Sequence, residues 1–304
     1  MRAVSLLPAA TEICAALGAL DLVAGATHEC DHPPEAARLP RVTRSAVPTE
    51  APPAAVDAAV REAVSVGAPL FQLDEPAITA LRPDVLLTQA LCDVCAVWEG
   101  DVRAVAARIG EATGRPPAVV TLGGTTIAGI QDDIRRAAAA LGRPAAGDAL
   151  AAAMDARLRA VHESLKAARA PRPRAAVVEW TAPVFLAGHW GPEMVGRAGG
   201  VDVLGAPGAH STTVPVEALA AADPEVVVVA PCGYNLERAA AEAEQLLADP
   251  RWAWLAGRAV WAVDANAYVS RPGPRVADGV EVLARVFNPA VFGGPEPGTA
   301  RRVA

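Results

Sequence analysis

The sequence has few aromatic residues, and it lacks the long apolar stretches that mark membrane or exported proteins. Aromatic side chains make up 4% of the 304 residues. No uninterrupted apolar run of about 18 residues occurs, so no membrane-spanning helix is predicted. The residues after Met1 form only a short strand-like run, without the longer apolar segment and cleavage site of a signal peptide. We therefore expect a cytoplasmic protein.

Clustered positive charge and the common catalytic motifs are also missing. The net charge of −7 and the pI near 5.3 argue against a nucleic-acid-binding surface. No serine–histidine–acid set and no pair of catalytic carboxylates stands out. The segment Gly123–Thr126 (GGTT) resembles a phosphate-binding turn at a helix start, but it lacks the lysine of a P-loop and the spacing of a dinucleotide motif. These absences favour a binding protein over an enzyme.

The chain does contain a regular alternation of apolar strands and helices. Hydrophobic residues make up 52% of it, mainly Ala, Val and Leu, which is typical of buried parallel strands. Strands are predicted at 2–7, 22–27, 85–89, 118–122, 175–179, 226–230 and 259–263. This pattern predicts an α/β fold with parallel sheets and helices on both faces of each sheet.

The predicted organisation has four parts. An N-terminal α/β lobe covers residues 1–125, and a C-terminal α/β lobe covers 171–290. Residues 126–170 contain two helices, and the second, at 145–168, is about 35 Å long at 1.5 Å per residue. That length is enough to join the two lobes. The Gly- and Pro-rich tail at 291–304 is expected to be loose.

Four of the five cysteines come directly after predicted strands: Cys30, Cys92, Cys95 and Cys232. Ligands of open α/β sheets bind at the carboxyl ends of the strands. Reduced cytoplasmic thiols bind metals more often than they form disulfides. The four thiols are therefore candidates for a shared zinc or iron–sulfur site, or they simply line a ligand cleft. Cys14 lies within an apolar helix and is expected to pack in the core.

Several segments resemble the class III substrate-binding proteins of ABC transporters, which capture vitamin B12, haem and ferric siderophores. They are Ser5–Glu12 (SLLPAATE), Leu81–Leu87 (LRPDVLL), Glu217–Val229 and Ser270–Arg275 (SRPGPR). The resemblance covers nearly the whole chain and is greatest to the cobalamin-binding branch, where Thr27–Asp31 (THECD) and Gly188–Trp190 (GHW) also fit. It implies two Rossmann-like lobes joined by a rigid helix, with the ligand in a cleft between them.

The resemblance also implies a function and a partner. It predicts a non-catalytic binding protein for cobalamin or a related corrinoid or metal-chelate ligand. Members of this family dock on their transporter through an acidic residue on each lobe. Glu217 matches the second of these positions, and Glu75 lies near the first.

Candidate ligand-binding residues come after predicted strands in both lobes. Neutral imidazole is a common metal ligand, so His28 and His189 are candidates for the axial position of a corrinoid cobalt or a haem iron. Large flat ligands bind in mostly apolar pockets with a few fixed polar groups. The further candidates are Trp98, Glu179, Trp180, Trp190, Tyr234, Asn266 and Tyr268.

Two alternatives use the same scaffold. In the first, the four cysteines hold an iron–sulfur cluster or zinc, and the protein is a cytoplasmic metalloprotein with redox or metal-handling activity. A cluster beside a bound corrinoid could also reduce its cobalt. In the second, the protein is a chelatase that inserts a metal into a macrocycle, with His189 and Glu179 facing each other.

Overall fold

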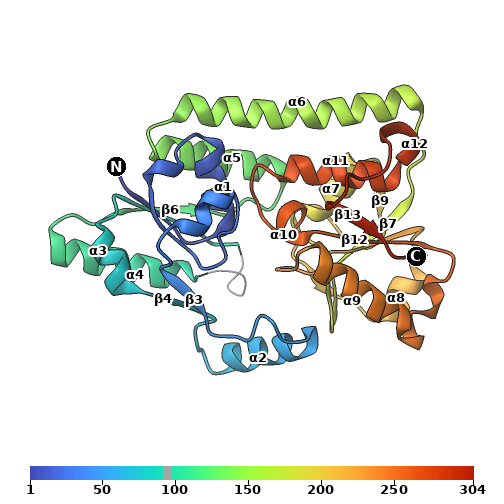
Figure 1. Cartoon of the computed structure of the whole chain (residues 1–304), viewed down its shortest axis with the longest axis horizontal. Coiled ribbons are helices and arrows are strands. Elements are labelled where there is room, and N and C mark those ends of the chain that lie inside the picture. Colours follow the sequence, from blue (N-terminus) through green and yellow to red (C-terminus); the bar gives the residue numbers. More distant parts are fainter. Residues whose placement is uncertain (92–96) are drawn as a thin grey trace. The chain divides into compact units, whose positions relative to one another are not determined.

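The computed structural model of the chain describes residues 1–91 and 97–304, and it divides into two compact units (Figure 1). Unit 1 comprises Met1–Gly124 and Ala128–Ala152, and unit 2 comprises Thr125–Ile127 and Ala153–Ala304. The long helix α6 (Pro144–Ala168) begins in unit 1 and ends in unit 2. The α/β class, with two lobes and a long connecting helix, is confirmed. A ligand cleft between the lobes stays a prediction.

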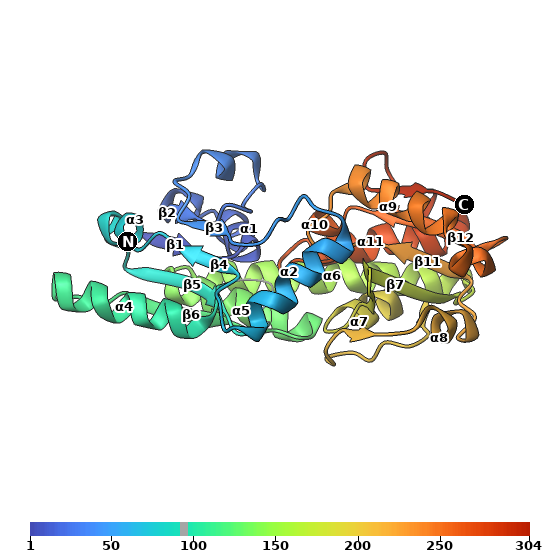
Figure 2. The same cartoon turned by 90° about the horizontal axis from the view of Figure 1, so that it is seen from below.

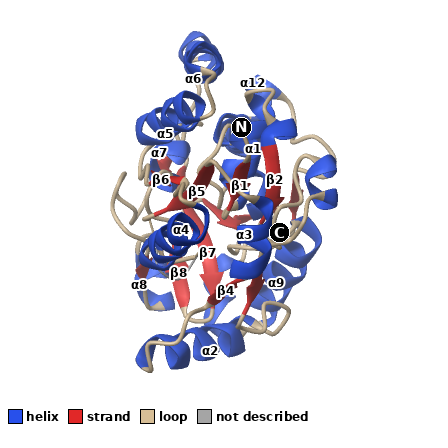
Figure 3. Cartoon of the chain, turned by 90° about the vertical axis from the view of Figure 1, so that its left-hand side faces the viewer, coloured by secondary structure: helices blue, strands red, loops and turns tan. Residues whose placement is uncertain are grey.

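Unit 1 is built on a parallel four-stranded sheet in the order β2-β1-β5-β6 (Figure 3). Its strands are β1 (Ala3–Ser5), β2 (Val23–Ala26), β5 (Val85–Gln89) and β6 (Ala118–Leu122). Every residue of β5 is buried, as expected for a central parallel strand. Helix α1 (Pro8–Ala16) contacts β1 and β2, and α4 (Glu99–Thr113) lies along β5 and β6 (Figure 2).

A second, two-stranded sheet in unit 1 is not predicted by the sequence. It pairs β3 (Thr43–Ser45) antiparallel with β4 (Phe71–Leu73), and each strand is too short to show an alternating pattern. The helices α2 (Pro53–Ser65) and α3 (Glu75–Leu81) flank β4 in sequence, and α5 (Ile127–Ala140) follows β6. Helix α3 begins where the Asp74 carboxylate accepts a hydrogen bond from the Ala77 N–H, a normal N-cap.

Unit 2 contains a seven-stranded sheet in which antiparallel strands are added to the predicted parallel ones. Its central strands, β7 (Arg174–Thr181), β11 (Val226–Val229) and β12 (Ala259–Val263), are parallel and match predicted strands. The strands β8 (Val184–Leu186) and β10 (Thr212–Thr213) extend one side antiparallel, and β9 (Val201–Asp202) pairs with β7. These added strands have two or three residues each, which is too short for a periodic pattern to predict them.

The helices of unit 2 pack mainly through small and branched apolar residues. They are α7 (Gly191–Arg197), α8 (Val216–Ala221), α9 (Leu236–Ala248), α10 (Ala265–Tyr268), α11 (Val276–Phe287) and α12 (Pro289–Phe292). The core combines the valines of β11 with residues of α9 and with Trp252, which is buried as predicted. None of the described helices is long and apolar enough to cross a membrane.

The tail is not loose, contrary to the expectation for 291–304. Strand β13 (Ala300–Arg302) pairs antiparallel with β12. The Val303 N–H also donates to the carbonyl of Val260 at 2.8 Å. Backbone hydrogen bonds hold this segment in place. Because they do not depend on the side chains, the Gly- and Pro-rich composition does not indicate the pairing.

Candidate functional site

The carboxyl ends of the parallel strands of unit 1 bring two of the candidate residues to one edge of the sheet. His28 follows β2, and Trp98 lies between β5 and α4. Parallel neighbours end at the same edge, and this is where α/β sheets bind ligands. The edge of unit 1 is therefore a candidate ligand-contacting edge of that unit.

The ring of His28 is held by two threonine hydroxyls. Its Nδ1 lies 2.8 Å from Oγ1 of Thr43 and 3.4 Å from Oγ1 of Thr27. The backbone N–H of His28 donates to the Thr43 hydroxyl, whose oxygen is in turn 2.8 Å from the Thr27 hydroxyl. Thr43 belongs to β3, so the small unpredicted sheet orients this imidazole.

The two ring nitrogens of His28 differ in their contacts. Its Nε2 is buried and has no hydrogen-bond partner among the described residues. Burial, and secondarily the positive charge of Arg41, lowers the pKa of His28, which keeps the imidazole neutral near pH 7. When Nδ1–H donates to Thr43, Nε2 carries the lone pair that a metal ligand needs.

Trp98 offers an exposed aromatic face at the same edge. Its side chain is 57% exposed. The indole ring lies against Gly100 at the start of α4, where a Cβ atom would collide with it. This position is consistent with the predicted contact to a flat ligand, and the contact itself stays a prediction.

In unit 2, the carboxyl ends of β7, β11 and β12 gather most of the other candidates. Glu179 and Trp180 lie near the end of β7, and Tyr234 follows β11. Asn266 and Tyr268 lie in α10, directly after β12. The three strands are parallel neighbours, so these side chains come from one edge of the sheet.

An aromatic and cationic stack occupies this edge of unit 2. The rings of Trp180 and Tyr234 meet edge to face with centroids 5.6 Å apart. The guanidinium carbon of Arg238 lies 3.8 Å from the centroid of the Tyr234 ring, a cation–π contact. Tyr234 is buried, and half-buried Trp180 donates its indole N–H to the carbonyl of Ala182 at 3.2 Å. Tyr234 and the Ala182 carbonyl therefore position Trp180, the more exposed member of the aromatic pair.

The remaining polar candidates at this edge also have fixed positions. The Glu179 carbonyl accepts a hydrogen bond from the Cys232 N–H, and the Asn266 amide donates to the carbonyl of Gly233 at 3.1 Å. Burial, with the nearby carboxylates of Asp264 and Asp278, raises the pKa of Tyr268. Tyr268 is therefore protonated at neutral pH and serves as a hydroxyl donor rather than a base.

The sequence predicts His189 and Trp190 at this edge, but the structure places them away from it. Strand β8 runs antiparallel to β7, with Leu186 opposite Val178, so it leads the chain away from the carboxyl ends. Trp190 is 6% exposed and donates its indole N–H to the carbonyl of Val269 at 2.8 Å. Trp190 is thus a core residue rather than a ligand wall, and His189 faces His210 instead.

The cysteines are only partly accounted for. Cys92 and Cys95 lie outside the described residues. Cys30 in unit 1 is 1% exposed, with its sulfur 3.0 Å from the Thr11 hydroxyl, whereas Cys232 in unit 2 is exposed. Within residues 1–91 and 97–304 no group of three or more His, Cys, Asp and Glu side chains is suited to a metal. Cys14 is buried as predicted, and burial raises its pKa to about 12.

The turn at Gly123–Thr126 is not a phosphate site. The backbone N–H groups of Gly123 and Gly124 both donate to one carboxylate oxygen of Asp133, each at 2.8 Å. Asp133 is 1% exposed, so its carboxylate takes the place that an anion would need. The turn resembles a phosphate-binding turn in sequence, but its N–H groups bind the carboxylate of Asp133 in the same chain.

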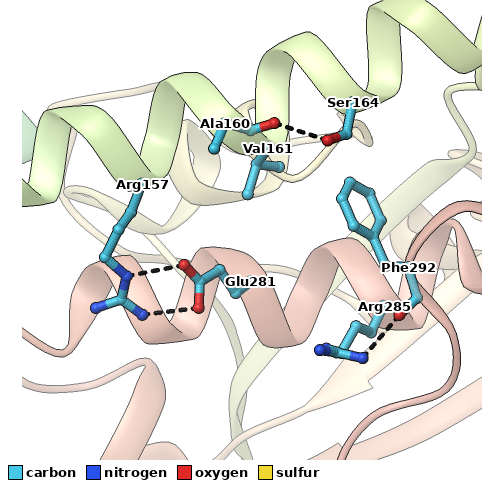
Figure 4. A pocket seen from close by; sticks show the side chains of 7 residues that line it. All are labelled: Arg157, Ala160, Val161, Ser164, Glu281, Arg285 and Phe292. Atoms are coloured by element: carbon cyan, nitrogen blue, oxygen red, sulfur yellow. Dashed lines mark hydrogen bonds and ion pairs between the residues drawn. The ribbon is translucent and has the colours of Figure 1, made fainter.

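A pocket of about 210 Å³ lies in unit 2 between α6 and α11 (Figure 4). Its lining residues are Arg157, Ala160, Val161, Ser164, Glu281, Arg285 and Phe292. Arg157 is committed to Glu281 and Asp278, and Arg285 donates to the carbonyl of Phe292 at 2.7 Å. Both cations already have partners, which argues for a structural groove rather than an anion site.

Three residues that shape the site are not predicted by the sequence reasoning. Arg238 follows Tyr234 by four residues, a spacing that brings side chains together at a helix start and is a usable signal. Thr43 lies 15 residues from His28, and His210 lies 21 residues from His189. Neither separation has a local pattern that predicts contact.

The sequence from residue 4 to residue 260 matches the family described as Periplasmic binding protein. A periplasmic heme binding protein from Pseudomonas aeruginosa is 24% identical, with a TM-score of 0.72 over 100% of this chain and 98% of that one. The periplasmic vitamin B12 binding protein BtuF of Vibrio cholerae is 21% identical (TM-score 0.64, 94% and 96% covered). The periplasmic heme-binding protein BhuT in complex with two hemes is 25% identical (TM-score 0.67, 95% and 98% covered). No curated protein sequence matches significantly.

These similarities agree with the fold and with the sequence motifs. The family match covers most of the chain, and the structural matches extend over nearly all of it. At identities of this level the solved structures establish the fold, and they leave the ligand open. The chain belongs to the periplasmic binding protein family.

Proposed function

We propose that the protein binds a metal-containing macrocycle, with a corrinoid such as cobalamin as the first candidate. The observation that carries this proposal is the half-buried ring of Trp180 near the carboxyl end of β7, which packs edge to face against buried Tyr234. Large flat ligands are held by apolar and aromatic walls with a few polar groups. Asn266 and Tyr268 supply such polar groups at the same edge.

His28 supplies the metal-directed part of the proposal. Its neutral imidazole has a buried Nε2 without a partner among the described residues, while Thr43 and Thr27 orient the ring. A cobalt or iron at the centre of a macrocycle accepts such a nitrogen as an axial ligand. In this proposal the metal arrives with the ligand as cargo.

Haem is the second candidate ligand. A neutral imidazole is a common ligand of haem iron. Two of the similar solved structures are heme-binding proteins, and a third binds vitamin B12. The two macrocycles share a flat ring and an axial metal position, so the same residues serve either one.

The test is a titration of the ligand-free protein with hydroxocobalamin and, separately, with haemin. We expect saturable binding of one macrocycle, tryptophan quenching, and a shift in the visible spectrum that His28→Ala abolishes. The matched control is His162→Ala, which removes an exposed histidine of α6. Binding of haemin alone would select the second candidate, and binding of neither macrocycle would contradict the proposal.

The alternative metalloprotein function depends on a site that the four cysteines would share. Cys92 and Cys95 lie outside the described residues, and the Cys30 sulfur is buried beside Thr11. We expect protein purified without oxygen to contain no iron and sulfide, and no zinc that depends on the cysteines. Stoichiometric metal that is lost in Cys92→Ser would establish the alternative.

The proposed partner is the membrane part of an ABC transporter. Glu217 is exposed in the first turn of α8 and is the better docking candidate. Glu75 is paired with Arg108 through two hydrogen bonds of 2.7 and 2.8 Å, so less of its charge is available for docking.

The family description favours the periplasm over the cytoplasmic location predicted from the sequence. Cell fractionation decides between these locations.

A further inference from the structure

Two histidines of unit 2 form a pair that the proposed function does not use. Nε2 of His189 and Nδ1 of His210 are 3.3 Å apart. Their rings are nearly perpendicular, with an interplanar angle of 86° and centroids 5.3 Å apart. His210 is exposed and His189 is half-buried, so the pair is open to solvent on one side.

The backbone holds the two imidazoles together. The His189 N–H donates to the carbonyl of Ala209, and the His189 carbonyl accepts from the Gly208 N–H at 2.8 Å. The Gly188 N–H donates to the Ser211 hydroxyl at 3.2 Å. A Cβ atom on Gly188 would overlap the backbone nitrogen of Ser211, so the two segments meet too closely for any other residue there. The backbone contacts between the two segments therefore keep the two histidines close together.

His189 also has a costly backbone conformation. Its φ of 51° lies in the left-handed region, which residues other than glycine seldom adopt. Strained residues persist where the surrounding structure holds them, and they cluster at ligand sites. The hydrogen bonds to Ala209 and Gly208 hold this one.

We propose that His189 and His210 bind a divalent transition metal ion, with Zn²⁺ as the first choice. Zn–N bonds are about 2.0–2.1 Å long, and two of them at a tetrahedral angle separate the nitrogens by about 3.3–3.4 Å. The separation found is 3.3 Å. Water fills the other positions, because no third His, Cys, Asp or Glu of the described chain completes the set.

The electrostatics of the pair are consistent with this site. Burial, and the neighbouring His210, lower the pKa of His189. Its ring is therefore neutral at pH 7, the form that coordinates a metal. Imidazole nitrogen suits Zn²⁺, Ni²⁺ and Cu²⁺ and has little preference for Mg²⁺ or Ca²⁺.

The test is calorimetric titration of the untagged, macrocycle-free protein with Zn²⁺. We expect one ion per chain, and a loss of affinity of about tenfold or more in His210→Ala, since each tenfold step is only about 1.4 kcal/mol. His189→Asn should show a similar loss, while asparagine tolerates the left-handed backbone. His162→Ala is the matched control and should bind like the wild type, and circular dichroism should report an unchanged fold in all three variants.

Zn²⁺ binding that survives in His210→Ala would overturn the proposal, as would a wild type that takes up no Zn²⁺. Either result would leave the pair as a simple hydrogen bond between two rings. The titration contains no macrocycle, so its outcome does not depend on the proposed function.

Discussion

The two units present different chemistry at the carboxyl ends of their parallel strands. In unit 1, two hydroxyls orient the imidazole of His28 and leave its Nε2 without a partner among the described residues. In unit 2, the edge is aromatic, with Trp180 against Tyr234 and Arg238 beside the tyrosine ring. The first arrangement suits a bond to a metal, and the second suits contact with the face of a flat ring. Similar strand edges in the two units thus carry different side-chain chemistry.

The difference arises in the connections rather than in the sheets. Both edges lie at the ends of buried valine- and leucine-rich parallel strands. The connecting segments differ: a hydroxyl-lined turn comes after β2, and an aromatic loop comes after β11. Loops on a rigid scaffold commonly supply binding residues, so single substitutions in each unit can separate the two contributions.

The largest effect is expected from Trp180→Ala in unit 2. Loss of this aromatic surface should weaken macrocycle binding by about 30-fold, since burying a large apolar side chain contributes about 2 kcal/mol. The visible spectrum of the bound ligand should keep its wild-type position. Fluorescence and absorbance titrations measure both quantities. Trp98→Ala in unit 1 is the comparison, and an equal loss there would mean that the aromatic contribution is not confined to unit 2.

The next largest effect is expected from His28→Ala in unit 1, where the spectrum should change more than the affinity. The spectral shift of the bound macrocycle should disappear, while affinity falls by about tenfold or less. Thr43→Val should fall between His28→Ala and the wild type, because removing a partner that orients a metal ligand weakens the bond without abolishing it. A wild-type spectrum in His28→Ala would contradict the proposed bond between His28 and the metal of the ligand.

A smaller effect is expected on stability from Arg157→Ala in unit 2. Arg157 on α6 donates to Glu281 on α11 at 2.8 and 2.7 Å (Figure 4). It also donates to Asp278, which lies on α11 too, at 2.6 Å. The groups are about one-third exposed, so the expected loss is about 1 kcal/mol in the free energy of unfolding. Urea titration measures it. Arg108→Ala, which breaks the exposed pair with Glu75 in unit 1, should cost less.

The smallest effect is a pH dependence with one contributor in each unit. The folded-state pKa values of His28 and His189 lie below the ordinary value, mainly because of burial. The unfolded chain therefore takes up protons first, so the stability present above about pH 6.5 falls as the pH drops through the folded pKa values. We expect a lower Tm at pH 5.5 than at pH 7.5. The difference should shrink in His189→Asn and stay unchanged in His162→Ala.

The sequence predicts long buried strands well and short added strands poorly. Strands β5, β6 and β12 have the predicted bounds, because each is an apolar run between clear turn signals. Strands β8, β10 and β13 have two or three residues each, which is too short for a side-chain pattern to mark them. The prediction of parallel strands in unit 2 is confirmed for β7, β11 and β12, and the short antiparallel additions are missed for this reason.

The same reasoning explains how much of the site could be predicted. His28, Trp180 and Tyr234 can be found from the sequence because they lie at the ends of buried strands. The partners that define the histidine chemistry, Thr43 for His28 and His210 for His189, come from other segments of the chain. The placement of His189 depends on the direction of β8, which is set by its pairing with β7. Pairing between distant segments is a property of the folded chain that local patterns do not encode.

Strand β13 has a consequence for how the protein behaves when it is concentrated. It is the outermost strand on its side of the unit 2 sheet, and its Arg301 and Arg302 are both exposed. A bare sheet edge invites strands from other molecules, and positive charge on the edge discourages them. Arg301 is tied to Glu237 on α9, which keeps one of these charges beside the sheet. The last strand thus protects unit 2 against aggregation by strand addition.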